Sequence, residues 1–268
     1  MAIDGEEPDY WVRSLAIPSV GANGQPGNLV SARYYQGKPA GAKPLVIVLP
    51  IWGSSEYPPR QIAHGYARHS DGNAHVVWLS GATPLFPWDE LSRTSSEQAF
   101  VDLALASAQR YRAAVIDIRR LVDWAEARPE IDAERIALIG FSMSSLVAAT
   151  VLGNEPRVST AVLMMGGARF ADIFVHCSKR VGEMRTHVLD TFGWTLPRYR
   201  EFFEGLFAPA DPIRYAGHYD PSRLLMIDAI FDDCMPRESR DALWEATGRP
   251  QRVSMPYSHR VAFYSLTP

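Results

Sequence analysis

Short apolar runs, each bounded by polar or turn-forming residues, recur along the 268-residue chain. The clearest four are Leu45 to Leu49, His75 to Leu79, Ile136 to Ile139 and Leu224 to Ile227. Runs of this length that are rich in Val, Ile and Leu are typical of strands buried on both faces of a parallel sheet. Ala161 to Met165 and Gln251 to Met255 are two further strand candidates. The pattern predicts a mostly parallel sheet.

A longer stretch, Ser95 to Ala127, has apolar residues at mixed spacings of three and four, which indicates one long helix or two. Arg128-Pro129 should close it, because the residue before proline is pushed out of helical conformation. Strands that alternate with helices predict a doubly wound α/β sheet with right-handed crossovers and helices on both faces.

The amino-terminal part has a different pattern. Trp11 to Ile17 and Leu29 to Tyr35 read as two antiparallel edge strands, joined by a Gly- and Asn-rich turn over Gly21 to Gly27. We expect a hairpin at the edge of the sheet.

The segment from Ala168 to Pro221 mixes Arg, Phe, Trp, Tyr and Pro without a strand-like pattern, and we interpret it as helical. It either acts as a lid or packs on the sheet only for stability. Its aromatic residues are expected mainly in the core and secondarily in a substrate pocket: Phe170, Trp194, Tyr199, Phe202, Phe203 and Phe207. The length predicts one domain over residues 1–268, with 168–221 as a lid-like insertion.

Composition excludes several classes of protein. Hydrophobic residues make up 47% and charged residues 21%, as in ordinary globular proteins. The 27 basic and 30 acidic residues give a net charge of −3, without the basic excess that nucleic-acid binding requires. Neither an export signal nor an apolar run of about 18 residues is visible, so we expect no membrane association and a cytoplasmic location.

Two cysteines, Cys177 and Cys234, lie in no metal-binding spacing. They are too few for a disulfide framework. We therefore expect free thiols, no metal site and no cofactor.

The strand candidate Ile136 to Ile139 runs directly into Gly140-Phe141-Ser142-Met143-Ser144 and then into a helical pattern. A strand, a sharp turn and a helix around Gly-x-Ser-x-small present a serine hydroxyl above the sheet, where it can act as a nucleophile. Gly140 fits this pattern. Ser144 stands where a second glycine is usual but keeps a small side chain. The alternative is that this segment is only a polar connection between a strand and a helix, without a catalytic role.

If Ser142 is a nucleophile in this arrangement, an acidic residue and then a histidine should follow later strands of the sheet. Asp232 follows the strand Leu224 to Ile227 and is our acid, although Asp233 could exchange roles with it or cap the next helix. Among seven histidines, only His259 follows the last strand candidate, and most of the others are expected at the surface. We expect His259 to act as the general base that Asp232 orients.

An oxyanion hole needs two backbone N–H donors. Met143, the residue after the nucleophile, is expected to supply one. The second would come from Ile51 or Trp52, directly after the strand Leu45 to Leu49. Pro50 has no N–H to donate.

From about Pro44 to His259, the chain resembles the α/β-hydrolase superfamily and, within it, the dienelactone-hydrolase-like branch. Ile51-Trp52-Gly53 is similar to the Ile-Phe-Gly of that branch, whose isoleucine amide is an oxyanion donor, which favours Ile51. The resemblance implies an α/β-hydrolase fold of about eight strands, with the helical excursion before the acid-bearing strand.

The chain departs from that branch at three points. The family's nucleophilic cysteine is Ser142 here, its thiol-gating acid is Pro50, and the arginine that follows its histidine is unmatched. We therefore expect a serine hydrolase that cleaves small-molecule carboxylic esters through an acyl-enzyme, rather than a dienelactone hydrolase. Thioesterase, acyltransferase or peptidase activity, or a non-catalytic binding protein of the same fold, are the alternatives.

Overall fold

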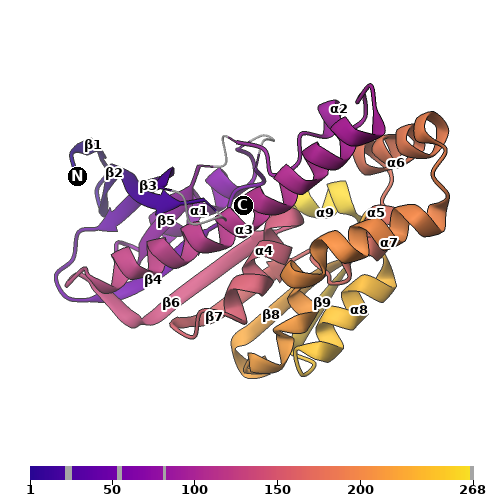
Figure 1. The fold of residues 1–268 in the computed structure, drawn as a ribbon. Coiled ribbons are helices and arrows are strands. Elements are labelled where there is room, and N and C mark those ends of the chain that lie inside the picture. Colours follow the sequence, from indigo (N-terminus) through magenta and orange to yellow (C-terminus); the bar gives the residue numbers. More distant parts are fainter. Residues whose placement is uncertain (22–25, 53–55, 81–82, 266–268) are drawn as a thin grey trace.

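The computed structural model describes residues 1–21, 26–52, 56–80 and 83–265 (Figure 1). Within these ranges, nine strands form a sheet in the order β1-β2-β3-β5-β4-β6-β7-β8-β9. The strands are β1 (Ile3–Glu6), β2 (Tyr10–Val20), β3 (Pro26–Gly37), β4 (Lys43–Val48), β5 (His75–Leu79), β6 (Ile131–Phe141), β7 (Val158–Met164), β8 (Leu224–Phe231) and β9 (Gln251–Ser258). From β5 to β9 every neighbouring pair is parallel, which confirms the predicted sheet.

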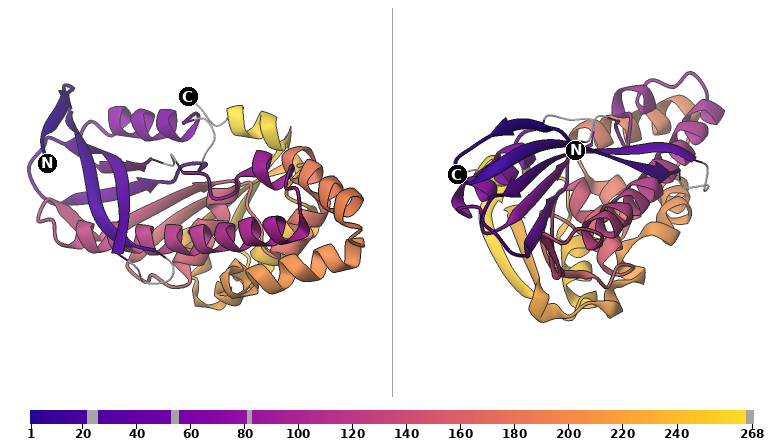
Figure 2. Two further views of the ribbon diagram at one scale, coloured as in Figure 1. Left: turned by 45° about the horizontal axis from the view of Figure 1, so that its top comes forward. Right: turned by 90° about the vertical axis from the view of Figure 1, so that its left-hand side faces the viewer.

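Helices cover both faces of the sheet, as predicted. They are α1 (Pro59–His69), α2 (Trp88–Leu91), α3 (Glu97–Glu126), α4 (Met143–Leu152), α5 (Phe170–His176), α6 (Lys179–Phe192), α7 (Leu196–Phe207), α8 (Arg237–Ala246) and α9 (His259–Ser265). Figure 2 shows α1 and α9 on one side of the sheet and α3 on the other. None of the described helices is long and apolar enough to cross a membrane.

Alternation along the central strands divides the core between the two faces. In β4, Leu45 and Ile47 pack with α3 and α4, whereas Val46 and Val48 pack with α1. Successive side chains of a strand point to opposite faces, so an uninterrupted apolar run fills both cores at once. These central strands are therefore buried on both sides. The carboxyl ends of the parallel strands meet at one edge of the sheet, where loops can carry functional residues.

The long helical stretch forms one helix. Its cap is Ser96, whose Oγ accepts a hydrogen bond from the amide of Ala99 at 3.2 Å. The helix ends at Glu126, just before Arg128-Pro129, where the sequence predicts the break.

The amino-terminal hairpin is present as β2 and β3, both longer than predicted. It does not form the edge, because β1 pairs outside β2. Residues 22–25 of the predicted turn lie outside the described residues. This unpredicted β1 accounts for nine strands instead of about eight.

The segment 168–221 is helical, as expected. It contains α5, α6 and α7, followed by the short 3-10 helices η1 (Ala208–Ala210), η2 (Pro212–Arg214), η3 (Ala216–His218) and η4 (Pro221–Arg223). Six of its aromatic residues lie buried in the main core: Phe170, Phe174, Trp194, Tyr199, Phe203 and Phe207. The lid-like role of this segment stays a prediction.

Candidate active site

The turn between β6 and α4 places Ser142 at the carboxyl end of the central strands. Ser142 has φ 51° and ψ −117°, a left-handed backbone conformation that a non-glycine residue rarely adopts. Gly140 permits the turn, because a Cβ at this position would lie 2.5 Å from the carbonyl oxygen of Ser144. The predicted strand, sharp turn and helix are all present.

Ser144 closes the same turn. Its buried Oγ accepts a hydrogen bond from the amide of Phe141 at 2.8 Å and donates to the carbonyl of Phe141 at 3.0 Å. The residue that departs from the usual second glycine thus ties the first turn of α4 to the last residue of β6. A serine fits here because its side chain is small and its hydroxyl is satisfied locally.

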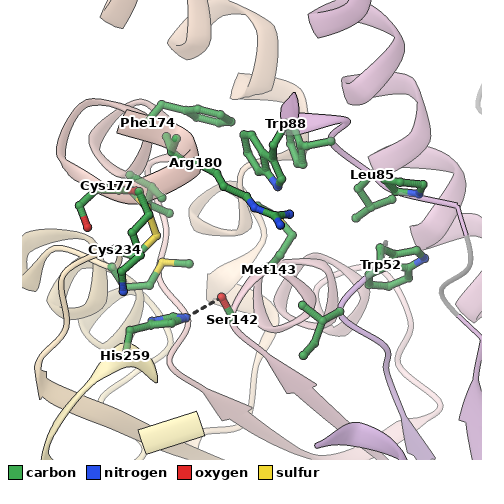
Figure 3. Close-up of a pocket in the computed structure, with 18 of the residues that line it drawn as sticks. Trp52, Leu85, Trp88, Ser142, Met143, Phe174, Cys177, Arg180, Cys234 and His259 are labelled. Atoms are coloured by element: carbon green, nitrogen blue, oxygen red, sulfur yellow. Dashed lines mark hydrogen bonds between the residues drawn. A yellow bond between two sulfur atoms is a disulfide. The ribbon is translucent and has the colours of Figure 1, made fainter. Parts of the chain in front are cut away.

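Three side chains that follow three different strands, β6, β8 and β9, form a continuous hydrogen-bonded row. His259, the first residue of α9, contacts Ser142 Oγ through Nε2 at 2.9 Å and Asp232 Oδ2 through Nδ1 at 2.7 Å (Figure 3 shows the contact with Ser142). In the neutral imidazole, Nδ1 donates to the Asp232 carboxylate, which can only accept, and Nε2 accepts from the serine hydroxyl. The Asp232 side chain is fully buried, and that of His259 is 16% exposed.

The two neighbouring aspartates have separate environments. Asp232 Oδ1 accepts hydrogen bonds from the amides of Cys234 at 2.8 Å and Met235 at 2.7 Å, which fix its carboxylate toward His259. Asp233 turns away and forms an ion pair with Lys179 at 2.8 Å. A hydrogen bond from Lys179 lowers the pKa of the Asp233 carboxyl. Asp233 does not cap α8 either.

The capping interpretation of Asp233 is wrong because α8 starts later than expected, with Pro236 at the cap position. The chain between β8 and α8 is therefore held by Asp232, whose oxygen takes the two free amides that follow it. One short loop thus orients a carboxylate without any contribution from the helix cap.

Four of the other histidines are exposed, as expected: His64, His69, His176 and His218. His187 is half-buried, and His75 is fully buried at the amino end of β5. None of these six lines the cavity above Ser142.

A cavity of about 480 Å³ opens above Ser142. Its walls are mainly apolar, and the large side chains that line it are Trp52, Leu85, Phe86, Trp88, Phe170, Ile173, Phe174 and Met235. Ile51 and Met143, the two predicted oxyanion donors, line it as well. Gly53 of the predicted motif lies outside the described residues. Over the described ranges, no group of three or more His, Cys, Asp or Glu residues could hold a metal ion.

The expectation of free thiols is wrong. Cys177, between α5 and α6, forms a disulfide with Cys234 in the loop after β8, and both residues line the cavity (Figure 3). The two cysteines lie 57 positions apart, so the sequence does not reveal their pairing. The disulfide joins the helical segment to the loop that holds Asp232.

Most of the cavity wall was not predicted. Leu85, Phe86 and Trp88 come from the loop and short helix before α3, and Phe174 and Arg180 come from α5 and α6. The signal for the first group is an apolar cluster, Leu85-Phe86-Pro87-Trp88, that belongs to no helix or strand period. Of the aromatic residues considered for the pocket, only Phe170 lines it among those described.

Comparison of the sequence with family models and with curated proteins finds no match. Comparison with solved structures finds acetyl xylan esterase 1 from Thermoanaerobacterium sp. JW/SL YS485, with a TM-score of 0.71 and 18% identity over 96% of this chain and 80% of that one. A cold-adapted esterase from an Arctic intertidal metagenomic library matches with a TM-score of 0.59 and 14% identity, over 97% and 91%.

The Pyrococcus horikoshii acylaminoacyl peptidase matches with a TM-score of 0.62 and 12% identity, over 94% of this chain but only 38% of that one. At these identities the comparisons show the fold alone. The chain has the α/β-hydrolase fold, and its structural neighbours include esterases and a peptidase. The resemblance to the dienelactone-hydrolase-like branch stays a prediction.

Proposed function

We propose that this protein is a serine hydrolase that cleaves carboxylic esters through an acyl-enzyme. The observation that carries the proposal is the row of hydrogen bonds from Ser142 through His259 to Asp232 at the floor of an apolar cavity. The esterases among the structural neighbours support the same class of reaction. Ester hydrolysis follows from this arrangement in two steps.

In the first step, Ser142 Oγ attacks the ester carbonyl carbon while its proton passes to His259 Nε2. The carbonyl π electrons move to the oxygen, which becomes the oxyanion of a tetrahedral intermediate. His259 then gives the proton to the leaving alkoxide, the carbon–oxygen bond breaks, and an alcohol departs. Asp232 keeps Nδ1 protonated and stabilises the imidazolium that forms between the two proton transfers.

In the second step, water attacks the acyl-enzyme, and the same histidine takes a proton from that water and returns it to Ser142. The products are a carboxylic acid and the free enzyme. No external oxidant or reductant is required.

The amides of Met143 and Ile51 are proposed to hold the oxyanion. Met143 begins α4, so its amide belongs to the first turn, where N–H groups have no partner inside the helix. The partial positive charge of this helix end favours an anion at the same place. Ile51 enters the cavity wall from the loop after β4, beside Ser142 and Met143.

A 4-nitrophenyl ester series from acetate to long acyl chains tests the proposal. We expect turnover by the wild type, with a preferred chain length set by the cavity, and loss of about 10⁴- to 10⁶-fold in kcat for Ser142→Ala. A fluorophosphonate probe should label the wild type at Ser142 and leave Ser142→Ala unlabelled.

Ser145→Ala is the matched control, because it removes a nearby buried hydroxyl in the first turn of α4 that has no hydrogen-bond partner among the described groups. It should keep both labelling and turnover. Turnover that survives Ser142→Ala would overturn the proposal, and a wild type that neither turns over esters nor takes the label would favour a binding protein.

A further inference from the structure

One cationic side chain extends into the cavity of the proposed active site. Arg180 is the second residue of α6 and lines the cavity together with Ser142, Met143 and Trp88. Figure 3 shows its side chain running from the helix into the cavity, with the guanidinium group directed toward the space between Trp88 and Met143, on the open side of Ser142.

The guanidinium group has no hydrogen-bond or ion-pair partner among the residues that the structure describes. Over the ranges that the structure describes, Arg180 forms neither a hydrogen bond nor an ion pair, whereas the adjacent Lys179 is held by Asp233 at 2.8 Å. Three acidic residues also line the cavity: Asp89 and Glu90, which are exposed, and Asp233, which Lys179 holds; none of the three is paired with Arg180. The five N–H donors of Arg180 are therefore available to a bound molecule.

The start of α6 adds a second feature that favours an anion. Ser178, Lys179 and Val181 line the cavity with Arg180, so the helix begins at its wall. Its own first turn contains no acidic residue, and Ser178 at the cap position forms no side-chain capping bond; the carboxylate of Asp233 lies beside this helix end and is paired with Lys179. A helix end of this kind presents unpaired N–H groups and a partial positive charge.

We propose that Arg180 determines substrate specificity by binding a carboxylate on the ester, so that the preferred substrates are half-esters of dicarboxylic acids. This inference rests on the proposed esterase function and names its substrate class. The apolar walls contact the carbon skeleton, and the guanidinium group pairs with the free carboxylate in a two-oxygen fork. The uncharged ester group is then left above Ser142.

A single negative charge fits the cavity better than a phosphate group. Arginine forks bind both groups, but Asp89, Glu90 and Asp233 on the cavity lining repel a dianion more strongly than a monoanion. The occupant to which the proposal commits is thus a carboxylate on an otherwise apolar chain or ring.

A matched pair of substrates tests this assignment: 4-nitrophenyl hydrogen adipate, which carries a carboxylate, and 4-nitrophenyl methyl adipate, which is neutral. Arg180→Gln should lower kcat/KM for the charged ester about 10- to 100-fold, mainly through KM, because a hydrogen-bonded charge pair is lost. For the neutral ester the change should stay below about threefold. Arg180→Lys keeps the charge without the fork and should fall between wild type and Arg180→Gln.

Arg237→Gln is the control for net charge, since Arg237 is 82% exposed on α8 and does not line the cavity. It should leave the ratio of the two kcat/KM values unchanged. Equal losses on both esters in Arg180→Gln, or no loss on either, would overturn the assignment.

A binding measurement separates this inference from the esterase proposal. In Ser142→Ala protein, monomethyl adipate should bind in calorimetry, dimethyl adipate should bind at least tenfold more weakly, and Arg180→Gln should abolish the difference. This result would support the carboxylate site even if the wild type hydrolysed no ester. Equal binding of the two compounds would reject the site while leaving hydrolysis of neutral esters intact.

Discussion

The two ends of the parallel strands each hold a histidine, and the two are used differently. At the amino end of β5, His75 is fully buried and bonded only to the backbone: Nδ1 accepts from the amide of Gly37 at 3.1 Å, and Nε2 contacts the carbonyl of Glu130 at 2.9 Å. At the carboxyl end, His259 contacts two side chains, Ser142 and Asp232, beside a cavity.

The difference shows what makes a histidine suitable for proton transfer. Backbone N–H and C=O groups have fixed roles as donor and acceptor, so they hold His75 in one neutral tautomer and give it no group with which to exchange a proton. A hydroxyl and a carboxylate can each change role during a reaction. Burial without a cavity makes the first histidine structural, whereas access to substrate makes the second one a candidate base.

The largest expected effect is a difference in kcat between variants of the two histidines. His259→Ala should lower kcat for 4-nitrophenyl esters by about 10⁴- to 10⁶-fold, since no other histidine of the described ranges lines the cavity. His75→Gln should change kcat by less than about threefold at a temperature where it is folded, because its site lies at the opposite end of the strands. Comparable losses of kcat in the two folded variants would contradict the contrast.

The two neighbouring aspartates allow a second comparison, between the acid that contacts His259 and one that does not. In Asp232→Asn, the amide oxygen would keep the bonds from Cys234 and Met235, which turns the NH₂ group toward His259 and favours the wrong tautomer. We expect a loss of about 10⁴-fold in kcat. Asp233→Asn is the matched control and should cost less than about tenfold, because Asp233 faces Lys179. The opposite ranking would assign the role to Asp233.

The sequence predicts the residues of the hydrogen-bonded row better than it predicts the residues that form the cavity walls. Apolar runs and the Gly-x-Ser-x-small turn have fixed spacings, so the strands, Ser142 and the order of acid and histidine could all be predicted. Cavity residues such as Trp88 and Phe174 come from irregular loops and short helices, and their contacts depend on how distant segments pack. No local pattern records such contacts.

The wrong prediction of free thiols has the same physical cause as the missed cavity residues. Cys177 and Cys234 lie 57 residues apart, and only the return of the chain through α6, α7 and β8 brings them together. The burial of His75 was also not predicted, because a histidine at the first position of an apolar run can face either solvent or the core. Spacing identifies partners within one element, and it does not identify those that the fold brings together.

Removal of the disulfide tests how much the covalent link between the helical segment and the loop that holds Asp232 contributes to stability and to activity. The double variant Cys177→Ser, Cys234→Ser should lower the free energy of unfolding by about 2–4 kcal/mol, measured by urea denaturation, because the unfolded chain loses a constraint. Asp232 keeps its two backbone donors, so kcat should fall by less than about tenfold. Wild type treated with a reductant should behave like the variant, and labelling of two free thiols before reduction would contradict the disulfide.

The smallest expected effect is a pH dependence of stability at the His75 end of the sheet. Burial lowers the pKa of His75 below its ordinary value of 6.5, and the nearby Lys43 acts in the same direction, whereas the contact with the Glu130 carbonyl and the Glu130 charge oppose it. The unfolded chain therefore binds the proton more readily than the folded one. The stability that neutral His75 contributes is present above pH 6.5 and is lost as the pH falls through the lowered pKa.

His75→Gln isolates this contribution from the titration of the carboxylates. A glutamine can still donate to the Glu130 carbonyl and accept from Gly37, but it does not titrate, so the decrease in unfolding free energy between pH 7.5 and pH 5 should be smaller in the variant than in wild type. An identical pH dependence in wild type and His75→Gln would show that His75 can take up a proton while it is buried, and the contrast between the two histidines would then rest on the cavity alone.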